Sequence, residues 1–191
     1  SGVALLSYGL AFMHLQQYIY AMLSFATLGV LVPFFYYNVF GNPEHCRKIF
    51  MGDTGSLTIG IMLSFLSIKL SLYTPTRDTF LYNPAALAFS PLMIPCLDVV
   101  RVFIHRIRMK KNPFMPDKSH IHHKLLALGM PQRKAMVTIV SLSLIFSLCN
   151  VVLSQYININ LLLIMDILVW TGANIWLTNK IEHRNLNPNY R

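Results

Sequence analysis

One short segment of the sequence combines a carboxylate with glycines directly before an apolar stretch. It reads Phe50-Met-Gly-Asp-Thr-Gly-Ser-Leu-Thr-Ile-Gly60. If the apolar stretch is a helix, Asp53 lies at its start, where free N–H groups and the helix dipole attract anions. Proteins often bind Mg²⁺ through one or two carboxylates together with substrate phosphates. Asp53 is therefore a candidate Mg²⁺ ligand, and the alternative is that Asp53 or Thr54 serves only as the N-cap of the helix.

A second segment, residues 101–124, is strongly basic. It carries seven Lys or Arg and four His residues against a single acid, Asp117. Pro113 and Pro116 interrupt any helix there. The histidines 120, 122 and 123 are of a type that binds metals, but cationic neighbours on both sides disfavour a divalent cation. Phosphate binding suits the composition better, and attraction to anionic lipid headgroups is the simpler alternative.

The elements that position these segments are apolar enough for a membrane. Hydrophobic residues make up 54% of the 191 residues and charged residues 12%, whereas a soluble domain carries about 25% charged residues. The mean hydropathy is +0.50. These values exclude most soluble folds and a disordered chain, and three cysteines are too few for a disulfide scaffold.

The polar clusters divide the chain into apolar segments. The sequence therefore predicts an all-α, polytopic transmembrane helix bundle, a single integral membrane domain over residues 1–191. Its first segment is too short to span a bilayer alone. Because the chain opens inside this segment without an initiator Met, we expect a C-terminal fragment of a larger protein. The six predicted segments are Val3–Met13, Tyr18–Tyr37, Gly55–Tyr73, Ala85–Ile104, Met136–Leu153 and Leu161–Leu177.

The basic residues predict the orientation of these segments, because Lys and Arg accumulate in short cytoplasmic loops. Of the 16 Lys and Arg residues, all but Lys69 and Arg77 lie in residues 38–54, in residues 101–135 or in the C-terminal tail. We therefore place the loops 38–54 and 101–135 and the C-terminal tail in the cytoplasm. Most of the net charge of +9 then reflects topology, and a nucleic-acid partner is not expected.

The two polar segments together resemble a known family. Phe50-Met-Gly-Asp-Thr-Gly-Ser and, some sixty residues later, Pro113-Phe-Met-Pro-Asp-Lys-Ser-His-Ile-His-His are similar to motifs of the polyprenyl-phosphate N-acetylhexosamine-1-phosphate transferases. The resemblance covers essentially the whole chain and corresponds to the C-terminal half of such an enzyme. It favours the WecA-like branch of glycosyltransferase family 4 over the MraY-like branch. Two acidic family motifs lie upstream of the residues that match.

The resemblance implies a role for several residues. Asp53 would be a catalytic Mg²⁺ ligand, with Mn²⁺ as an alternative metal, and His120, His122 and His123 would line the diphosphate and nucleotide site. His122 would also be catalytic. Arg101 would neutralise the phosphates. Asn38 resembles a family Asn near the nucleotide, although the segment from it to Asp53 is longer here.

The implied reaction is transfer of an N-acetylhexosamine 1-phosphate, as in UDP-N-acetylglucosamine, to undecaprenyl phosphate. UMP would be released in the first membrane step of a cell-surface glycan pathway such as O-antigen synthesis. The implied partners are a UDP-N-acetylhexosamine, the polyprenyl phosphate lipid and the membrane, with a homodimer as a further expectation. The implied location is the bacterial cytoplasmic membrane.

Two other acids have structural interpretations. Asp98 lies three residues before Arg101, a helical spacing that predicts an ion pair orienting the arginine. Asp166 lies within the sixth segment, where we expect it to pair with Asn174 or with a neighbouring helix. A non-enzymatic transporter fragment or a scaffold that binds anionic lipid is the alternative function, and Mg²⁺-dependent UMP release would discriminate it from the transferase.

Overall fold

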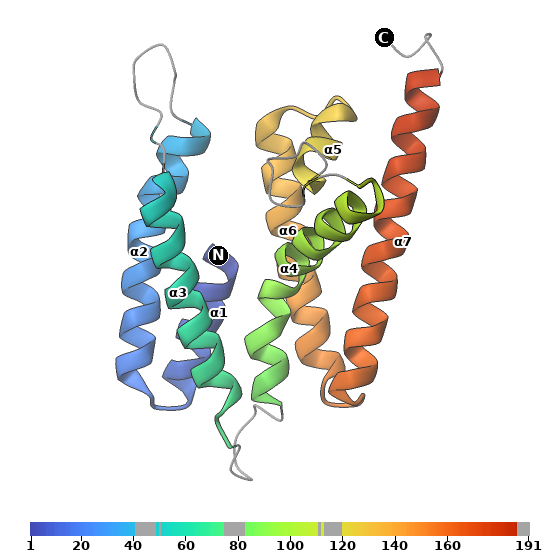
Figure 1. Cartoon of the computed structure of the whole chain (residues 1–191). Coiled ribbons are helices and arrows are strands. Elements are labelled where there is room, and N and C mark those ends of the chain that lie inside the picture. Colours follow the sequence, from blue (N-terminus) through green and yellow to red (C-terminus); the bar gives the residue numbers. More distant parts are fainter. Residues whose placement is uncertain (41–48, 50, 75–82, 111, 113–119, 187–191) are drawn as a thin grey trace. The chain divides into compact units, whose positions relative to one another are not determined.

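All regular structure in the described part of the chain is helical (Figure 1). The computed structural model describes residues 1–40, 49, 51–74, 83–110, 112 and 120–186. The all-α prediction is confirmed. The helices are α1 (Gly2–His14), α2 (Tyr18–Phe40), α3 (Gly52–Ser71), α4 (Pro84–Arg108), α5 (Ile121–Ala127), α6 (Gln132–Leu153) and α7 (Ile159–Leu186).

Five of the described helices, α2, α3, α4, α6 and α7, are long and apolar enough to cross a membrane. Between 11% and 33% of the most apolar stretch of each is buried against the rest of the protein. Most of their apolar surface therefore needs lipid as its solvent. Helix α1 has 13 residues, fewer than the roughly 20 that a spanning helix needs. The predicted set of one short and five long segments in a multi-pass membrane protein is confirmed.

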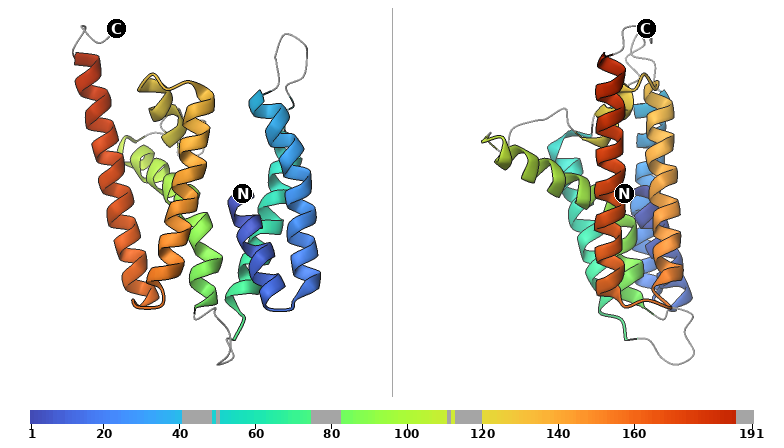
Figure 2. Two further views of the ribbon diagram at one scale, coloured as in Figure 1. Left: turned by 180° about the vertical axis from the view of Figure 1, so that it is seen from behind. Right: turned by 90° about the vertical axis from the view of Figure 1, so that its right-hand side faces the viewer.

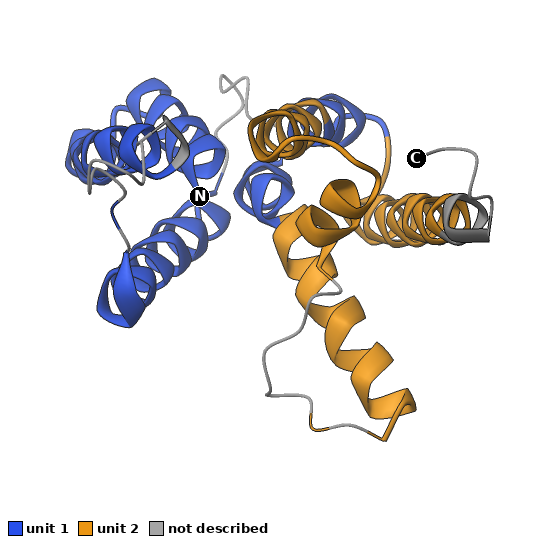
Figure 3. Cartoon of the chain, turned by 90° about the horizontal axis from the view of Figure 1, so that it is seen from above, with its two compact units in different colours: residues 1–92, 146–156 blue, residues 93–145, 157–191 orange. Residues whose placement is uncertain are grey.

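The chain divides into two compact units (Figure 3). The first comprises residues 1–92 and 146–156, and the second comprises residues 93–145 and 157–191. Of the predicted site residues, Asn38 and Asp53 belong to the first unit. Arg101 and the histidines 120, 122 and 123 belong to the second.

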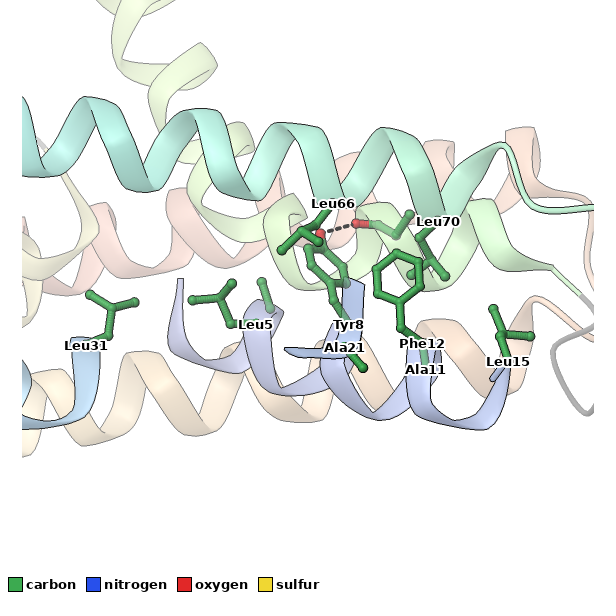
Figure 4. Close-up of a cluster of buried hydrophobic side chains, with 11 residues drawn as sticks. Leu5, Tyr8, Ala11, Phe12, Leu15, Ala21, Leu31, Leu66 and Leu70 are labelled. Atoms are coloured by element: carbon green, nitrogen blue, oxygen red, sulfur yellow. Dashed lines mark hydrogen bonds between the residues drawn. The ribbon is translucent and has the colours of Figure 1, made fainter. Parts of the chain in front are cut away.

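An apolar core holds the first unit together. Tyr8 of α1 and Leu66 of α3 are completely buried, and Phe12 is 2% exposed. These side chains form one cluster with Leu70 (Figure 4). The Tyr8 hydroxyl donates a hydrogen bond to the carbonyl oxygen of Ala88. The phenol is thus satisfied where no water is available.

Helices α1 and α2 approach each other closely at small residues. The Ser24 hydroxyl donates to the carbonyl oxygen of Leu5 at 2.7 Å. A Cβ at Gly9 would lie 2.7 Å from the tip of the Phe25 ring. Small residues and hydroxyl bonds are the usual means of helix packing in lipid, where burial of apolar surface gains little.

The second unit contains several buried polar side chains. Along α7, which runs unbroken in both views of Figure 2, buried positions recur every four residues and include Asp166, Trp170 and Asn174. They therefore share one face of the helix. Asn174 is not the partner of Asp166, because the two lie eight residues, or about 12 Å, apart along α7. Its amide donates instead to the carbonyl oxygen of Trp170 at 3.1 Å.

The predicted cytoplasmic loop 101–135 contains more helix than expected. Helix α4 continues to Arg108, α5 occupies Ile121–Ala127, and α6 begins at Gln132. Basic residues in the last turn of α4 interact favourably with the helix dipole. Helix α7 likewise extends to Leu186, beyond the predicted end at Leu177. The helices therefore do not stop where their apolar stretches stop.

Candidate active site

Asn38 lies near the end of α2, at the point where the chain turns toward α3. Its side-chain amide donates to the carbonyl oxygen of Ile49 at 3.1 Å. The bond fastens the end of α2 to the residues directly before α3. The structure therefore brings Asn38 and the start of α3, which carries Asp53, to the same end of the first unit.

Asp53 is the second residue of α3, and it is exposed. No described residue donates a hydrogen bond to its carboxylate or pairs with it. Met51 is the N-cap, without a side-chain capping bond, so the alternative that Asp53 or Thr54 caps the helix is wrong. A carboxylate in the first turn interacts favourably with the helix dipole. Asp53 is thus an accessible carboxylate at a helix start.

Two glycines shape this helix start. Gly52 has φ +65°, a left-handed conformation that glycine adopts at little cost. A Cβ at Gly55 would lie 2.8 Å from Cγ of Met51. The space beside Gly55 is therefore occupied by the Met51 side chain, which packs over the first turn of α3.

In the second unit, Asp98 of α4 gathers two of the predicted site residues. Its Oδ1 accepts hydrogen bonds from Nη2 of Arg101 at 3.0 Å and from Nε at 3.4 Å. Its Oδ2 lies 3.0 Å from Nδ1 of His120 and accepts the backbone N–H of Ile121 at 3.3 Å. The predicted Asp98–Arg101 pair is confirmed, whereas the contact with His120 could not be read from helical spacing.

The three histidine rings lie next to one another. The rings of His120 and His122 are stacked with centroids 6.0 Å apart, and those of His122 and His123 are 4.0 Å apart. Burial lowers the pKa of His122 below its ordinary value of 6.5, the charges of His123 and His120 lower it further, and Asp98 raises it. His122 is thus biased toward a neutral imidazole that is available to a ligand.

Lys124 joins α5 to α7. Its Nζ donates to Oγ1 of Thr178 at 2.8 Å, to Oδ1 of Asn174 at 3.4 Å and to the Asn174 carbonyl oxygen at 3.5 Å. Burial and then the charge of Arg101 lower the pKa of Lys124, while Asp98 raises it. The helix that carries the histidines is therefore held by α4 at its start and by α7 in its last turn.

Sequence reasoning missed Lys124 and Arg106. Arg106 is 7% exposed and donates from Nη1 to the carbonyl oxygen of Asn112 at 2.8 Å. Its signal lay in the sequence, because Asp98, Val102 and Arg106 recur every four residues and share one face of α4. No sequence signal connects Lys124 with Asn174, fifty residues away.

The described residues contain no group of three or more His, Cys, Asp or Glu side chains that could hold a metal ion. A single exposed carboxylate such as Asp53 does fit Mg²⁺, which commonly takes most of its remaining ligands from water and substrate phosphates. Pro113, Pro116, Asp117 and the other motif residues up to Ser119 lie outside the described residues.

Comparison with known proteins agrees with these features. Residues 1–71 match the family model for glycosyl transferase family 4. The chain is 36% identical over 163 residues to a probable undecaprenyl-phosphate N-acetylglucosaminyl 1-phosphate transferase of Bacillus subtilis, covering 85% of this chain and 43% of that protein. No solved structure matches the chain significantly.

Two other relatives have similar names. The chain is 34% identical over 140 residues to an undecaprenyl-phosphate alpha-N-acetylglucosaminyl 1-phosphate transferase of Pasteurella multocida, covering 73% of this chain and 38% of that protein. It is 39% identical over 102 residues to a decaprenyl-phosphate N-acetylglucosaminephosphotransferase of Mycobacterium leprae, covering 50% and 25%. The chain thus spans less than half the length of these relatives. By the family model over residues 1–71, and by these relatives over more of its length, the chain is similar to glycosyl transferase family 4 and to N-acetylglucosaminyl 1-phosphate transferases.

Proposed function

We propose that the protein transfers N-acetylglucosamine 1-phosphate from UDP-N-acetylglucosamine to undecaprenyl phosphate and releases UMP. The observation that carries this proposal is a cluster in which Arg101 and His120 contact the buried carboxylate of Asp98, and the rings of His122 and His123 follow next to His120. It supplies cationic and imidazole groups beside the end of an apolar helix. The names of the relatives supply the class of lipid and sugar.

The chemistry of such a transfer suits these residues. An oxygen of the lipid phosphate attacks the β-phosphorus of the nucleotide sugar, and the bond from that phosphorus to the bridging oxygen of UMP breaks. Phosphoryl transfer depends mainly on positioning and on neutralising charge. Arg101 would neutralise the diphosphate, and the imidazoles of His120, His122 and His123 would contact the nucleotide side of the substrate.

Mg²⁺, with Mn²⁺ as an alternative, is part of the proposal. Asp53 would hold it, because this carboxylate is exposed and is not engaged by any described residue. When bound, the ion would neutralise phosphate charge. Asn38 would keep the start of α3 in place through its bond to Ile49.

The same proposal places the protein in the bacterial cytoplasmic membrane, with the site-bearing ends of α2 and α4 in the cytoplasm. The support is the asymmetric distribution of Lys and Arg, which follows the positive-inside rule. A homodimer belongs to the proposal as well, and light scattering of the detergent-solubilised protein tests it. The comparisons give no support to a transporter or a lipid-binding scaffold.

The test is UMP release by the protein expressed from its complete reading frame in membranes that contain undecaprenyl phosphate. We expect release to require a UDP-N-acetylhexosamine and a divalent cation, and to stop on chelation with EDTA. Asp53→Asn, which keeps the shape of the side chain and removes its charge, should abolish nearly all turnover. Wild-type turnover of Asp53→Asn would refute the role of Asp53, and the absence of UMP release from the unaltered protein would refute the proposed function.

A further inference from the structure

We propose that Asp98 is a positioning residue, which holds His120 in one tautomer and Arg101 in one orientation so that both present their outer nitrogens to substrate. This inference rests on the proposed function. It extends that proposal because Asp98 itself does not touch the substrate.

The first step of the argument is the number of donors that one carboxylate receives. Asp98 is 6% exposed and is contacted by four N–H positions, two from Arg101, one from His120 and one from the backbone of Ile121. A buried charge is tolerated only when it is paired and hydrogen-bonded. Asp98 meets this condition with groups from α4 and from the start of α5.

The second step concerns the proton on His120. An ionised carboxylate only accepts hydrogen bonds, so the contact of 3.0 Å between Oδ2 of Asp98 and Nδ1 of His120 requires the proton on Nδ1. The opposite tautomer would point a lone pair of Nδ1 at the carboxylate. In the neutral ring Nε2 is then the acceptor, and in the charged ring it is the second donor. A carboxylate that fixes an imidazole in this way is a frequent supporting arrangement.

The third step is that the oriented groups are accessible although their anchor is buried. The side chain of Arg101 is 23% exposed and that of His120 is 32% exposed, against 9% for that of Asp98. Both Nε and Nη2 of Arg101 face the same oxygen, which fixes the plane of the guanidinium. The arrangement is therefore a buried anchor with two accessible, oriented side chains.

A merely structural acid would contribute stability and nothing more, so the test reads the tautomer directly. The protein, expressed from its complete reading frame and labelled with ¹⁵N-histidine, is examined by NMR in detergent at pH 8, and His120→Gln identifies the His120 signals. We expect a protonated Nδ1 and an unprotonated Nε2. Asp98→Asn offers an amide that can donate to Nδ1, so its His120 should shift toward the opposite tautomer.

The kinetic arm compares Asp98→Asn with Asp98→Glu in the UMP-release assay. Loss of the partner that orients a metal-ligating histidine typically costs roughly 10–100-fold in activity, and we expect Asp98→Asn, which removes the partner of His120, to lose a similar factor in kcat/KM. Asp98→Glu, which keeps the charge, should recover part of the loss. Asp166→Asn removes a different buried acid, and it should leave the His120 tautomer as it is in the unaltered protein.

Two results would overturn the inference. One is an unaltered protein whose His120 carries its proton on Nε2 rather than on Nδ1. The other is an Asp98→Asn protein with both the original tautomer and the original kcat/KM. The NMR arm needs no substrate, so it decides the tautomer even if the unaltered protein releases no UMP, which would instead refute the proposed function.

Discussion

The two units are stabilised by different interactions, although both are built from apolar helices. In the first unit, buried apolar side chains of α1, α2 and α3 interdigitate around Tyr8 and Phe12. In the second unit, the contacts that fix α5 are charge-assisted hydrogen bonds, accepted by Asp98 on one side and donated by Lys124 on the other.

The two kinds of contact constrain side chains in different ways. Apolar packing distributes its stabilisation over many weak contacts between side chains, and these contacts have no preferred direction. Hydrogen bonds to charged groups are short and directional, and they orient the groups that they join. In the unit that carries Arg101 and the histidines, charge-assisted hydrogen bonds orient side chains of the candidate site, whereas the first unit combines apolar packing with single hydroxyl bonds from Tyr8 and Ser24.

The largest expected effect is on the packed unit. Phe12→Ala should lower the free energy of unfolding by roughly 3 kcal/mol, the low end of the range for such substitutions, because lipid solvates the side chain after unfolding and mainly the cavity cost remains. Unfolding of the purified protein in mixed micelles measures it. Leu57→Ala on the exposed face of α3, where Leu57 is 67% exposed, is the matched control, with less than about 0.5 kcal/mol expected. Equal losses in the two variants would mean that the core is not the main source of stability in this unit.

A smaller effect is expected for the bond between α5 and α7. Lys124→Met keeps the length of the side chain but removes its donors to Asn174 and Thr178, and it should cost about 1 kcal/mol, since hydrogen bonds between membrane helices average roughly 0.6 kcal/mol each. Faster hydrogen exchange in Ile121–Ala127 should accompany the loss. Lys134→Met changes an exposed lysine of α6 and should leave α5 protected. Unchanged exchange in Lys124→Met would show that the bonds from Lys124 to α7 are not needed to hold α5.

The smallest effect is a dependence of stability on pH that originates in the second unit. The pKa of His122 in the folded protein lies below 6.5, its ordinary value, so the unfolded chain binds this proton more readily. Stability should therefore fall as the pH drops below about 6.5 and level off beneath the lowered pKa. Thermal unfolding between pH 7.5 and pH 5 measures the slope. His122→Gln should flatten the slope, and an unchanged slope would assign it to other groups.

The membrane fold was predictable because its signals are local and strong. Long runs of mostly apolar residues located α2, α3, α4, α6 and α7, and the predicted starts of these helices lie within four residues of the observed ones. The ends were less predictable, because a helix continues past its apolar stretch when basic residues favour its C-terminus, as in α4. The short helix α5 was missed, since it falls in a polar segment that contains no apolar run.

The candidate site was predictable only in part. The motifs identified Asp53 and the histidines by residue type, and helical spacing identified the Asp98–Arg101 pair. The contacts of Asp98 with His120 and of Lys124 with Thr178 join residues 22 and 54 positions apart. Such pairs depend on how helices pack, which neither periodicity nor composition specifies.

The bond from Asn38 to Ile49 has a consequence for how this protein can vary. It joins residues 11 positions apart and so fixes both ends of the intervening segment. Because the acceptor is the backbone carbonyl oxygen of Ile49, this bond places no demand on the side chain at position 49, whereas position 38 must supply a side-chain donor.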